Sequence, residues 1–266
     1  MNASLAASLA SLDGEIMPAE EATIPATDEG LLRGDGVFEV IRVYDGRPFA
    51  LEEHLARLQR SAGNLRLPLD VEAVRADAFR LLARAGSGPD HELLRIVLTR
   101  GGRRLLLTEP LPPSAERIRL RSITYAPTRI LDGVKSLSYA ANMLASRLAR
   151  EQGYDDAVLV TPHGRVLELP TSSIFWIKDG AILTPPLADH ILASITRAAV
   201  IALAGARECE CTLADLEGAD EAFVASTTRE VQPVAAIDER TFHEVGPVTA
   251  EVAEAMSAHI QSELRA

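Results

Sequence analysis

Lys135 is the residue whose type and position most suggest covalent chemistry. The 27 basic residues are 25 arginines and two lysines, Lys135 and Lys178. Only lysine can lose its proton when buried, and only its primary amine can form a Schiff base with an aldehyde. Lys178 stands beside an Asp-Gly pair that predicts a hairpin turn, so a solvated turn position accounts for it. Lys135 immediately precedes a predicted amphipathic helix, where a side chain can point into a cleft between two domains.

A Schiff base between Lys135 and pyridoxal phosphate (PLP) requires a phosphate cradle and an acid for the pyridinium nitrogen. The segment SITRAAVIALAG (194–205) predicts a helix that Ser194 can cap. The backbone N–H groups of Ile195 and Thr196 would then point at an anion. Capping alone also explains a serine at this position, so the segment is a candidate cradle only in combination with other features.

Further positions complete this hypothetical site. Three hydroxyls follow an apolar strand and could form a second part of the cradle, although a plain turn would also explain them: Ser226, Thr227 and Thr228. Arg57 is the candidate cation, because a guanidinium can engage two phosphate oxygens at once. Glu168 lies between two apolar segments, and buried acids are rarely unpaired, which makes it the candidate acid.

The elements before residue 126 read as an α+β unit. The segment VFEVIRVYDGRPFAL (37–51) alternates apolar and polar residues around Asp45-Gly46, which predicts a hairpin. A helix follows from Leu51, with apolar residues at helical spacing up to Gly63. Strands are predicted at 93–99 and 117–125. The polar, irregular segment 126–133 predicts a linker, so residues 1–125 form an N-terminal α/β domain.

The remaining residues, 134–266, predict a C-terminal domain, which would be the PLP-binding domain if Lys135 forms the Schiff base. An amphipathic helix is expected with Leu137, Ala141, Leu144 and Leu148 on one apolar face and Gly153 as its stop. Strands are predicted at DAVLVT, SSIFWI, AILT and EAFVAST, and helices at SITRAAVIALAG and over the last residues. The fold class is therefore α/β (α+β), with two domains.

Composition excludes several classes of partner. The formal charge of −11 argues against nucleic acid and against anionic membranes, because both require a concentrated basic surface. Cys209 and Cys211, two residues apart in a possible strand, suit neither a disulfide nor a four-ligand zinc site, and the six histidines are scattered, so no metal site is predicted. The segment MNASLAASLASLDGE lacks the basic region of a signal sequence, and we expect a cytoplasmic protein.

Five segments, in order along the chain, resemble the class IV aminotransferases, the fold-type IV branch of PLP enzymes. The match begins at about Arg33 and consists of RGDGVFEVIRVYDGRPFALEEHLARLQRSA, VKSLSYAANMLA, GRVLELPTSSIFWIKDGAILTPP, HILASITR and STTREVQPV. The resemblance implies a smaller N-terminal domain, a larger C-terminal domain and a cofactor in the cleft. It also implies a homodimer in which loops of one subunit complete the pocket of the other.

The same resemblance implies a role for each candidate residue. Lys135 would form the Schiff base and shuttle the proton between the substrate Cα and the cofactor, and Glu168 would hold the pyridine nitrogen. Leu192 would pack against the ring, while Tyr139 would approach the phenolic oxygen. The residues expected to bind the phosphate are Arg57, Ile195, Thr196 and Thr227, and Ser194 is a further residue of the cofactor site. Two departures from the family pattern are Ser194 in place of a glycine and Ser173 in place of an asparagine.

For the substrate, the segments FEVIRVYDGRPFALEEHLARL and STTRE look most like D-amino-acid transaminases. Those enzymes usually fix the α-carboxylate with a tyrosine, an arginine and a histidine. Here the tyrosine position is Phe38, and the residues after LTRG read GRRLLL, without histidine. Arg103 or Arg104 would bind the carboxylate, with Thr228 as a further substrate contact. We therefore expect amino-group transfer between D-amino acids and 2-oxo acids, with some primary amines also accepted.

Three alternatives stay open at this point. KSLSYAANMLA resembles aminodeoxychorismate lyases, which form 4-aminobenzoate and pyruvate, as closely as it resembles transaminases. An L-branched-chain aminotransferase is a nearby variant of the leading hypothesis. The third alternative is a small-ligand binding protein that has kept the fold, which a protein without affinity for PLP would support.

Overall fold

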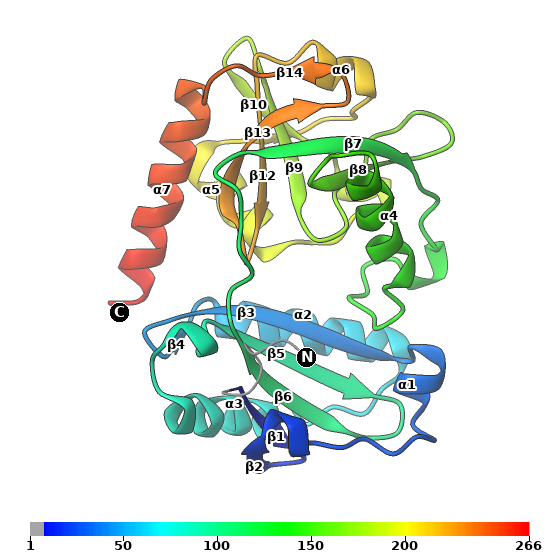
Figure 1. The fold of residues 1–266 in the computed structure, drawn as a ribbon, viewed down its shortest axis with the longest axis vertical. Helices are drawn as coiled ribbons and strands as arrows, with labels where there is room; N and C mark the ends of the chain where they lie inside the picture. The colour runs from blue at the N-terminus through cyan, green and yellow to red at the C-terminus, as the bar shows by residue number, and fades with distance from the viewer. Residues whose placement is uncertain (1–7, 266) are drawn as a thin grey trace. The chain divides into compact units, whose positions relative to one another are not determined.

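The computed structural model describes residues 8–265, which form two compact units (Figure 1). Unit 1 contains residues 8–113 together with Val134–Tyr139, and unit 2 contains Ser114–Gly133 and Ala140–Arg265. Residues 1–7, which open the segment considered as a signal sequence, and residue 266 lie outside the described residues. Among the described helices, none is both long enough and apolar enough to cross a membrane.

Unit 1 is built on a six-stranded sheet with the order β2-β1-β6-β5-β3-β4, in which all neighbours are antiparallel. The strands are β1 (Leu9–Leu12), β2 (Glu15–Pro18), β3 (Gly36–Tyr44), β4 (Arg47–Pro48), β5 (Leu93–Thr99) and β6 (Arg104–Glu109). Its helices are α1 (Glu29–Arg33), α2 (Leu51–Leu65) and α3 (Val71–Ala85).

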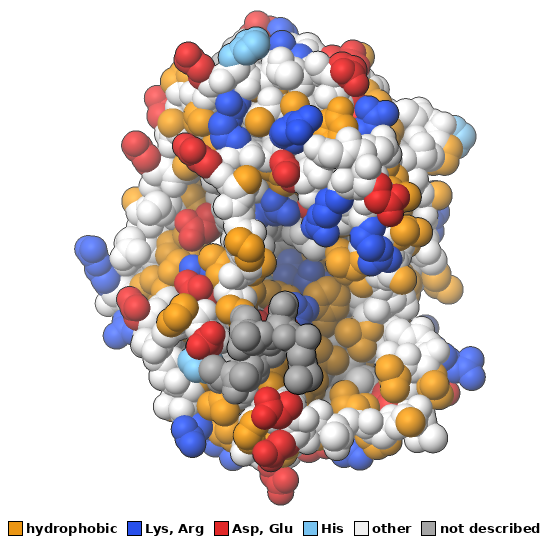
Figure 2. All heavy atoms as spheres, in the orientation of Figure 1, with side chains coloured by type: hydrophobic (Ala, Val, Ile, Leu, Met, Phe, Trp, Pro, Cys, Tyr) orange, Lys and Arg blue, Asp and Glu red, His pale blue; other side chains and the backbone are white. Residues whose placement is uncertain are grey.

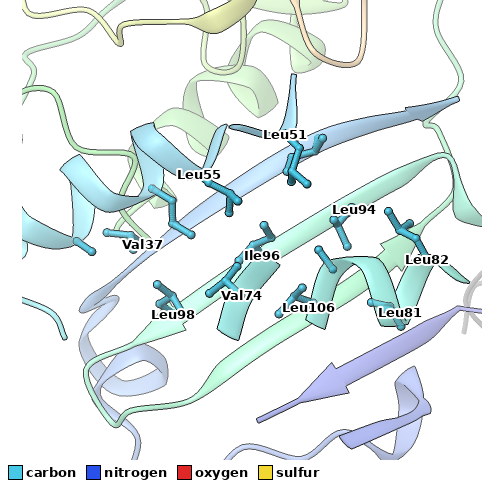
Figure 3. Packing of buried hydrophobic residues seen from close by; sticks show 14 of the residues in the cluster. Val37, Leu51, Leu55, Val74, Leu81, Leu82, Leu94, Ile96, Leu98 and Leu106 are labelled. Atoms are coloured by element: carbon cyan, nitrogen blue, oxygen red, sulfur yellow. The ribbon is translucent and has the colours of Figure 1, made fainter. Parts of the chain in front are cut away.

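One face of this sheet packs against α2 and α3. Because side chains alternate along a strand, Val37 and Ile41 of β3 share a face with Leu94, Ile96 and Leu98 of β5. Figure 3 shows Val37, the labelled side chains of β5 and the leucines of the two helices pointing toward one another in a single core. The opposite face of β3 carries Phe38, Val40 and Arg42.

Unit 2 contains a sheet with the strand order β11-β10-β9-β12-β13-β7-β8, and β14 pairs with β13. The strands are β7 (Ile118–Thr124), β8 (Asp156–Val160), β9 (Ser173–Lys178), β10 (Ala181–Thr184), β11 (Arg207–Glu208), β12 (Glu221–Ser226), β13 (Glu230–Ile237) and β14 (Arg240–Thr241). The helices are α4 (Ala140–Glu151), α5 (Ile195–Ala204), α6 (Leu213–Glu217) and α7 (Pro247–Glu263). On the face shown in Figure 2, basic side chains lie among acidic and apolar ones.

The units differ from the division predicted at residue 125. β7 pairs with β8 and β13, so residues 118–124 belong to the sheet of unit 2, and 126–133 also count with that unit. Residues 134–139 belong instead to unit 1, because the Phe38 N–H donates to Lys135 O (3.0 Å) and the Leu137 N–H donates to Gly36 O (2.9 Å). The sequence pattern predicts helices and strands but does not show which sheet a strand joins. The predicted domain boundary therefore differs from the observed one.

Two local predictions also need correction. The helix after Lys135 begins at Ala140, and its buried residues are Ala145, Ser146 and Ala149, whereas Leu144 and Leu148 of the predicted apolar face are exposed. The two free cysteines lie just beyond β11 rather than within a strand, with Cys209 exposed and Cys211 buried.

Candidate active site

A short bridge to β3 fixes the backbone of Lys135. Ser136 pairs with Val37, and the Lys135 N–H donates to Oγ of the buried Ser61 in α2 (3.2 Å). Gly36 makes this pairing possible, since a Cβ at that position would lie 2.4 Å from Leu98 O and 2.5 Å from Leu137 Cδ1. The glycine of the Asp-Gly-Val-Phe segment therefore serves close backbone approach beside the lysine.

The Lys135 side chain lies against two aromatic rings of unit 1. Its Nζ is 4.5 Å from the ring centroid of Phe38 and 5.7 Å from that of Tyr139. The two rings meet edge to face, with their centroids 5.3 Å apart. The structure thus brings together the predicted catalytic lysine, Phe38 and Tyr139.

Arg57 belongs to a buried charged triad on the other side of β3. Its Nε and Nη2 donate to the two carboxylate oxygens of Glu39 at 2.7 and 2.6 Å, and His54 Nδ1 lies 2.8 Å from Glu39 Oε2. The side chains of Glu39, His54 and Arg57 are 0, 2 and 5% exposed. Arg57 is therefore held rigidly, with the edge that carries Nε and Nη2 already occupied by a carboxylate.

The triad shifts the pKa values of two of its members. Burial would raise the pKa of Glu39, but hydrogen bonds from Arg57 and His54 outweigh it and lower that pKa to about 2. Burial lowers the pKa of His54, helped by the positive charges of Arg57 and Lys135 and opposed by Glu39. We therefore assign a neutral imidazole whose Nδ1–H donates to an ionised Glu39 paired with Arg57.

Glu39 and His54 are absent from the predicted site, although the sequence holds a signal for both. Glu39 falls between Val37 and Ile41 on the core-facing side of β3, an unusual place for a carboxylate without a partner. His54 and Arg57 are three residues apart on α2, and so share a helical face with the buried leucines. A strand acid opposite a helix His-x-x-Arg pair indicates a buried triad.

The predicted carboxylate binders Arg103 and Arg104 both pair with aspartates of unit 1. Arg103 Nη1 donates to Asp13 Oδ2 (2.7 Å) in the β1–β2 turn. Arg104 points to the core side, where its Nε donates to Asp77 Oδ2 of α3 (2.6 Å). Alternation along β6, which begins at Arg104, places the Arg104 side chain, and the sequence does not show on which face β6 presents it.

Arg95 is the arginine that the sheet places beside Phe38. It pairs with Val40 across β3 and β5, which puts its side chain on the Phe38 face. The guanidinium lies 5.9 Å from the Phe38 ring centroid, and its Nε and Nη2 both donate to Glu109 at 2.8 Å. The alternation of side chains along LLRIVLT (93–99) places Arg95 on the face opposite to Leu94 and Ile96, and this pattern could have indicated it as a candidate.

In unit 2, Glu168 and Leu192 lie together. The Leu192 N–H donates to Glu168 Oε1 (3.1 Å), and Glu168 is half-buried. Burial raises the pKa of Tyr125, and the negative charge of Glu168 adds to that shift. Tyr125 in turn donates from its hydroxyl to Asn142 Oδ1 (3.2 Å). The carboxylate therefore has a fixed orientation toward the loop before α5.

Unit 2 also holds the predicted phosphate-binding segments. Ser194 caps α5 as predicted, because its Oγ accepts from the Arg197 N–H (3.2 Å). As at every helix start, the N–H groups of Ile195 and Thr196 have no partner within the helix. Thr227 and Thr228 lie in the turn between β12 and β13, and α5 packs against β12. The donors of a helix start and of a hydroxyl-bearing turn suit an anion such as a phosphate.

Each unit by itself contains groups that a PLP enzyme requires. Unit 1 contains a primary amine on an aromatic surface and a rigid arginine, and unit 2 contains a carboxylate and two segments whose N–H and hydroxyl donors suit an anion. Among residues 8–265, no group of three or more His, Cys, Asp or Glu side chains could hold a metal ion. This donor set fits PLP, which needs an amine, an acid and a phosphate cradle, and the class is therefore that of PLP enzymes.

Comparison with known proteins gives the family. The model for amino-transferase class IV matches residues 36–237, so the chain belongs to the class IV aminotransferases and is a PLP-dependent aminotransferase. This confirms the predicted family, fold class and cofactor.

Similar proteins carry related names. A putative branched-chain-amino-acid aminotransferase of Methanocaldococcus jannaschii is 37% identical over 270 residues, covering 91% of this chain and 93% of that protein. A D-alanine aminotransferase of Listeria monocytogenes is 33% identical over 269 residues, covering 91% and 92%. A solved structure, the PLP-bound form of a hypothetical aminotransferase from Mycobacterium tuberculosis, has a TM-score of 0.88 at 28% identity, covering 96% and 99%.

Proposed function

We propose that this aminotransferase moves an amino group between D-amino acids and 2-oxo acids in two successive half-reactions, and that it also accepts some primary amines. The observation that carries the proposal is the placement of Lys135, whose Nζ lies 4.5 Å from the Phe38 ring on the face that also carries Arg95. A reactive amine, an aromatic surface and a guanidinium on one sheet face suit a small substrate with a carboxylate.

Lys135 would hold the cofactor covalently and, once the substrate amine has displaced it, would carry the proton to and from the substrate Cα. PLP, when bound, withdraws electrons from the bond that breaks at Cα. Glu168 would keep the ring nitrogen protonated, and its bond from the Leu192 N–H holds the carboxylate in place for that role. Leu192 would cover the ring, and Tyr139 would approach the phenolic oxygen.

The predicted phosphate ligands have the donors that this group requires. Ile195 and Thr196 would offer backbone N–H groups behind the Ser194 cap, and Thr227 would offer its hydroxyl. Arg57, which Glu39 holds through Nε and Nη2, would supply positive charge for the phosphate. The triad therefore supports the proposal by fixing Arg57 before the phosphate arrives.

For the substrate carboxylate we propose Arg95 in place of Arg103 and Arg104, with Thr228 as a further contact. Glu109 shares the guanidinium of Arg95, so the substrate carboxylate would compete with Glu109 for it. This competition lowers the affinity for the carboxylate and supports acceptance of amines that lack one.

The test is an absorbance spectrum of the yellow protein after separate additions of D-alanine, D-glutamate and L-leucine, each without a keto acid. We expect D-alanine or D-glutamate to remove the visible band of the bound cofactor, and pyruvate or 2-oxoglutarate to restore it. Bleaching by L-leucine alone would refute the D-preference and assign branched-chain activity. Release of pyruvate from aminodeoxychorismate, with no keto acid present, would assign the lyase reaction instead.

We also propose a homodimer located in the cytoplasm. Leu31 and Leu32 on α1 are 66 and 62% exposed, and Ile130 is 88% exposed, which supports an interface with a second copy. The two free cysteines are compatible with a reducing compartment. Light scattering after size exclusion would test the dimer, and a monomer at micromolar concentration would refute it.

A further inference from the structure

The turn that carries Thr227 and Thr228 has an unusual backbone conformation, and side-chain contacts stabilise it. β12 ends at Ser226 and β13 begins at Glu230, and these two residues pair across the hairpin. The Arg229 N–H donates to Ser226 O (3.3 Å), and Glu230 has a φ of +53°. Three-residue hairpin loops commonly combine such a turn with a left-handed residue, but that residue is usually glycine. Here a glutamate occupies a conformation that L-residues avoid, so other contacts must hold the turn.

The side chain of Arg229 supplies those contacts. Its Nη1 donates to Gln232 Oε1 (2.8 Å), and its Nη2 donates to Asp156 Oδ2 (2.9 Å) on β8. Because β7 lies between β13 and β8 in the sheet, the bond to Asp156 extends across the neighbouring strand. The Arg229 side chain is 18% exposed and that of Asp156 is 2% exposed, so the ion pair is shielded from water.

Both partners of Arg229 are themselves anchored. Asp156 Oδ1 accepts from Ser146 Oγ of α4 (2.6 Å) and from the Ala157 N–H (2.9 Å). Gln232 Nε2 donates to Ser114 Oγ (2.9 Å), at the start of unit 2. The position of the turn is thus tied to α4, to β8 and to the segment that leads into β7.

We propose that Arg229 is a positioning residue that holds the Thr227–Thr228 turn in the geometry that binds the cofactor phosphate. The inference rests on the proposed role of this turn in the phosphate cradle. Arg229 acts through the turn and does not touch the phosphate, because both of its terminal nitrogens already point to Gln232 and Asp156. Its loss should therefore weaken binding of the phosphate group and leave recognition of the pyridine ring unchanged.

The experiment compares PLP with pyridoxal, which has the same aldehyde and ring but no phosphate. Dissociation constants of both are measured on the dialysed full-length protein by absorbance, for the wild type, Arg229→Met and Arg229→Lys. We expect R229M to weaken PLP about tenfold, the loss of one charge-assisted hydrogen bond, and to leave pyridoxal within about twofold. R229K keeps one donor for Asp156 and should recover part of the PLP affinity.

Arg121→Met is the matched control, since Arg121 also pairs with an aspartate of unit 2 (Asp238, 3.2 Å) but near the opposite end of β13. It should leave the ratio of the two constants unchanged. Gln232→Ala removes the other anchor and should shift the ratio in the same direction as R229M; it decides the matter if R229M does not fold.

Equal losses of affinity for PLP and pyridoxal, or an unchanged ratio of the two dissociation constants in both R229M and Q232A, would overturn the inference. The proposed function would still stand in that case, provided that the wild-type protein binds PLP more tightly than pyridoxal. A wild-type protein that binds PLP no better than pyridoxal would overturn the proposed phosphate cradle and this inference with it.

Discussion

Glu39→Gln tests whether the buried triad stabilises unit 1 through charge. Glutamine keeps the shape of the side chain and removes its charge, so it mimics a protonated Glu39 beside Arg57. The hydrogen bonds from Arg57 and His54 lower the pKa of Glu39 from its ordinary 4.5 to about 2, which favours the ionised form. Because a tenfold change in an equilibrium constant corresponds to about 1.4 kcal/mol, E39Q should lower the free energy of unfolding by about 3 kcal/mol at neutral pH.

The sign of the pH dependence follows from the depressed pKa. The stabilisation is fully present above the unfolded-state pKa near 4.5, and it is lost as the pH falls from there toward 2. The difference between wild type and E39Q should therefore be constant from pH 7 to pH 5 and should shrink below pH 4.5.

Urea unfolding followed by far-UV circular dichroism measures this difference. The single tryptophan, Trp176, lies on β9 of unit 2, so its fluorescence reports that unit and separates it from unit 1. Glu52→Gln is the control: Glu52 receives the same Nε and Nη2 fork from Arg75 at 2.9 and 2.7 Å, but its side chain is 64% exposed. It should cost less than about 1 kcal/mol. Similar losses for the two variants, or a loss in E39Q that stays constant down to pH 3, would refute the reasoning.

Three further predictions concern single residues. Lys135→Arg should keep the circular dichroism spectrum but abolish both amino transfer and the borohydride-stable cofactor adduct detected by mass spectrometry, since a guanidinium cannot replace the amine; residual turnover would contradict this. Ser194→Ala should cost about 1 kcal/mol of stability and weaken PLP, while Ser194→Asn, which can also cap, should retain both; an S194A protein with normal PLP affinity would count against the cradle. His54 is held neutral, so urea midpoints should fall as the pH drops below 6.5, and His54→Gln should flatten that slope.

Local chemistry explains which elements could be predicted. In the hairpin turn, Asp45 and Gly46 have φ values of +48° and +79°. Two-residue turns with positive φ at both positions favour an Asp-Gly pair. The cap at Ser194 needs only a side chain that reaches the third N–H of the helix. Both features depend on neighbours within a few residues, which the sequence contains in full.

Features that depend on distant pairing escaped prediction. Leu144 and Leu148 have helical spacing, yet the face of α4 that packs on β8 is the one with the smaller Ala145 and Ala149. Arg104 turns to the core side of its sheet, where Asp77 of α3 receives it. Neither outcome can be read from periodicity, because periodicity shows that a face exists but not what covers it.

By itself, the sequence determined the family, the cofactor and the candidate amine, because a scarce lysine and five ordered segments carry that information locally. Only the tertiary structure decided the environment of each group. It placed Lys135 beside Phe38, joined Arg57 to Glu39, and brought Arg95 rather than Arg104 to the Phe38 face. Strand register places Arg95 and Arg104, and the packing of α2 on β3 places Arg57. Both depend on two segments that meet in space, which no single stretch of sequence contains.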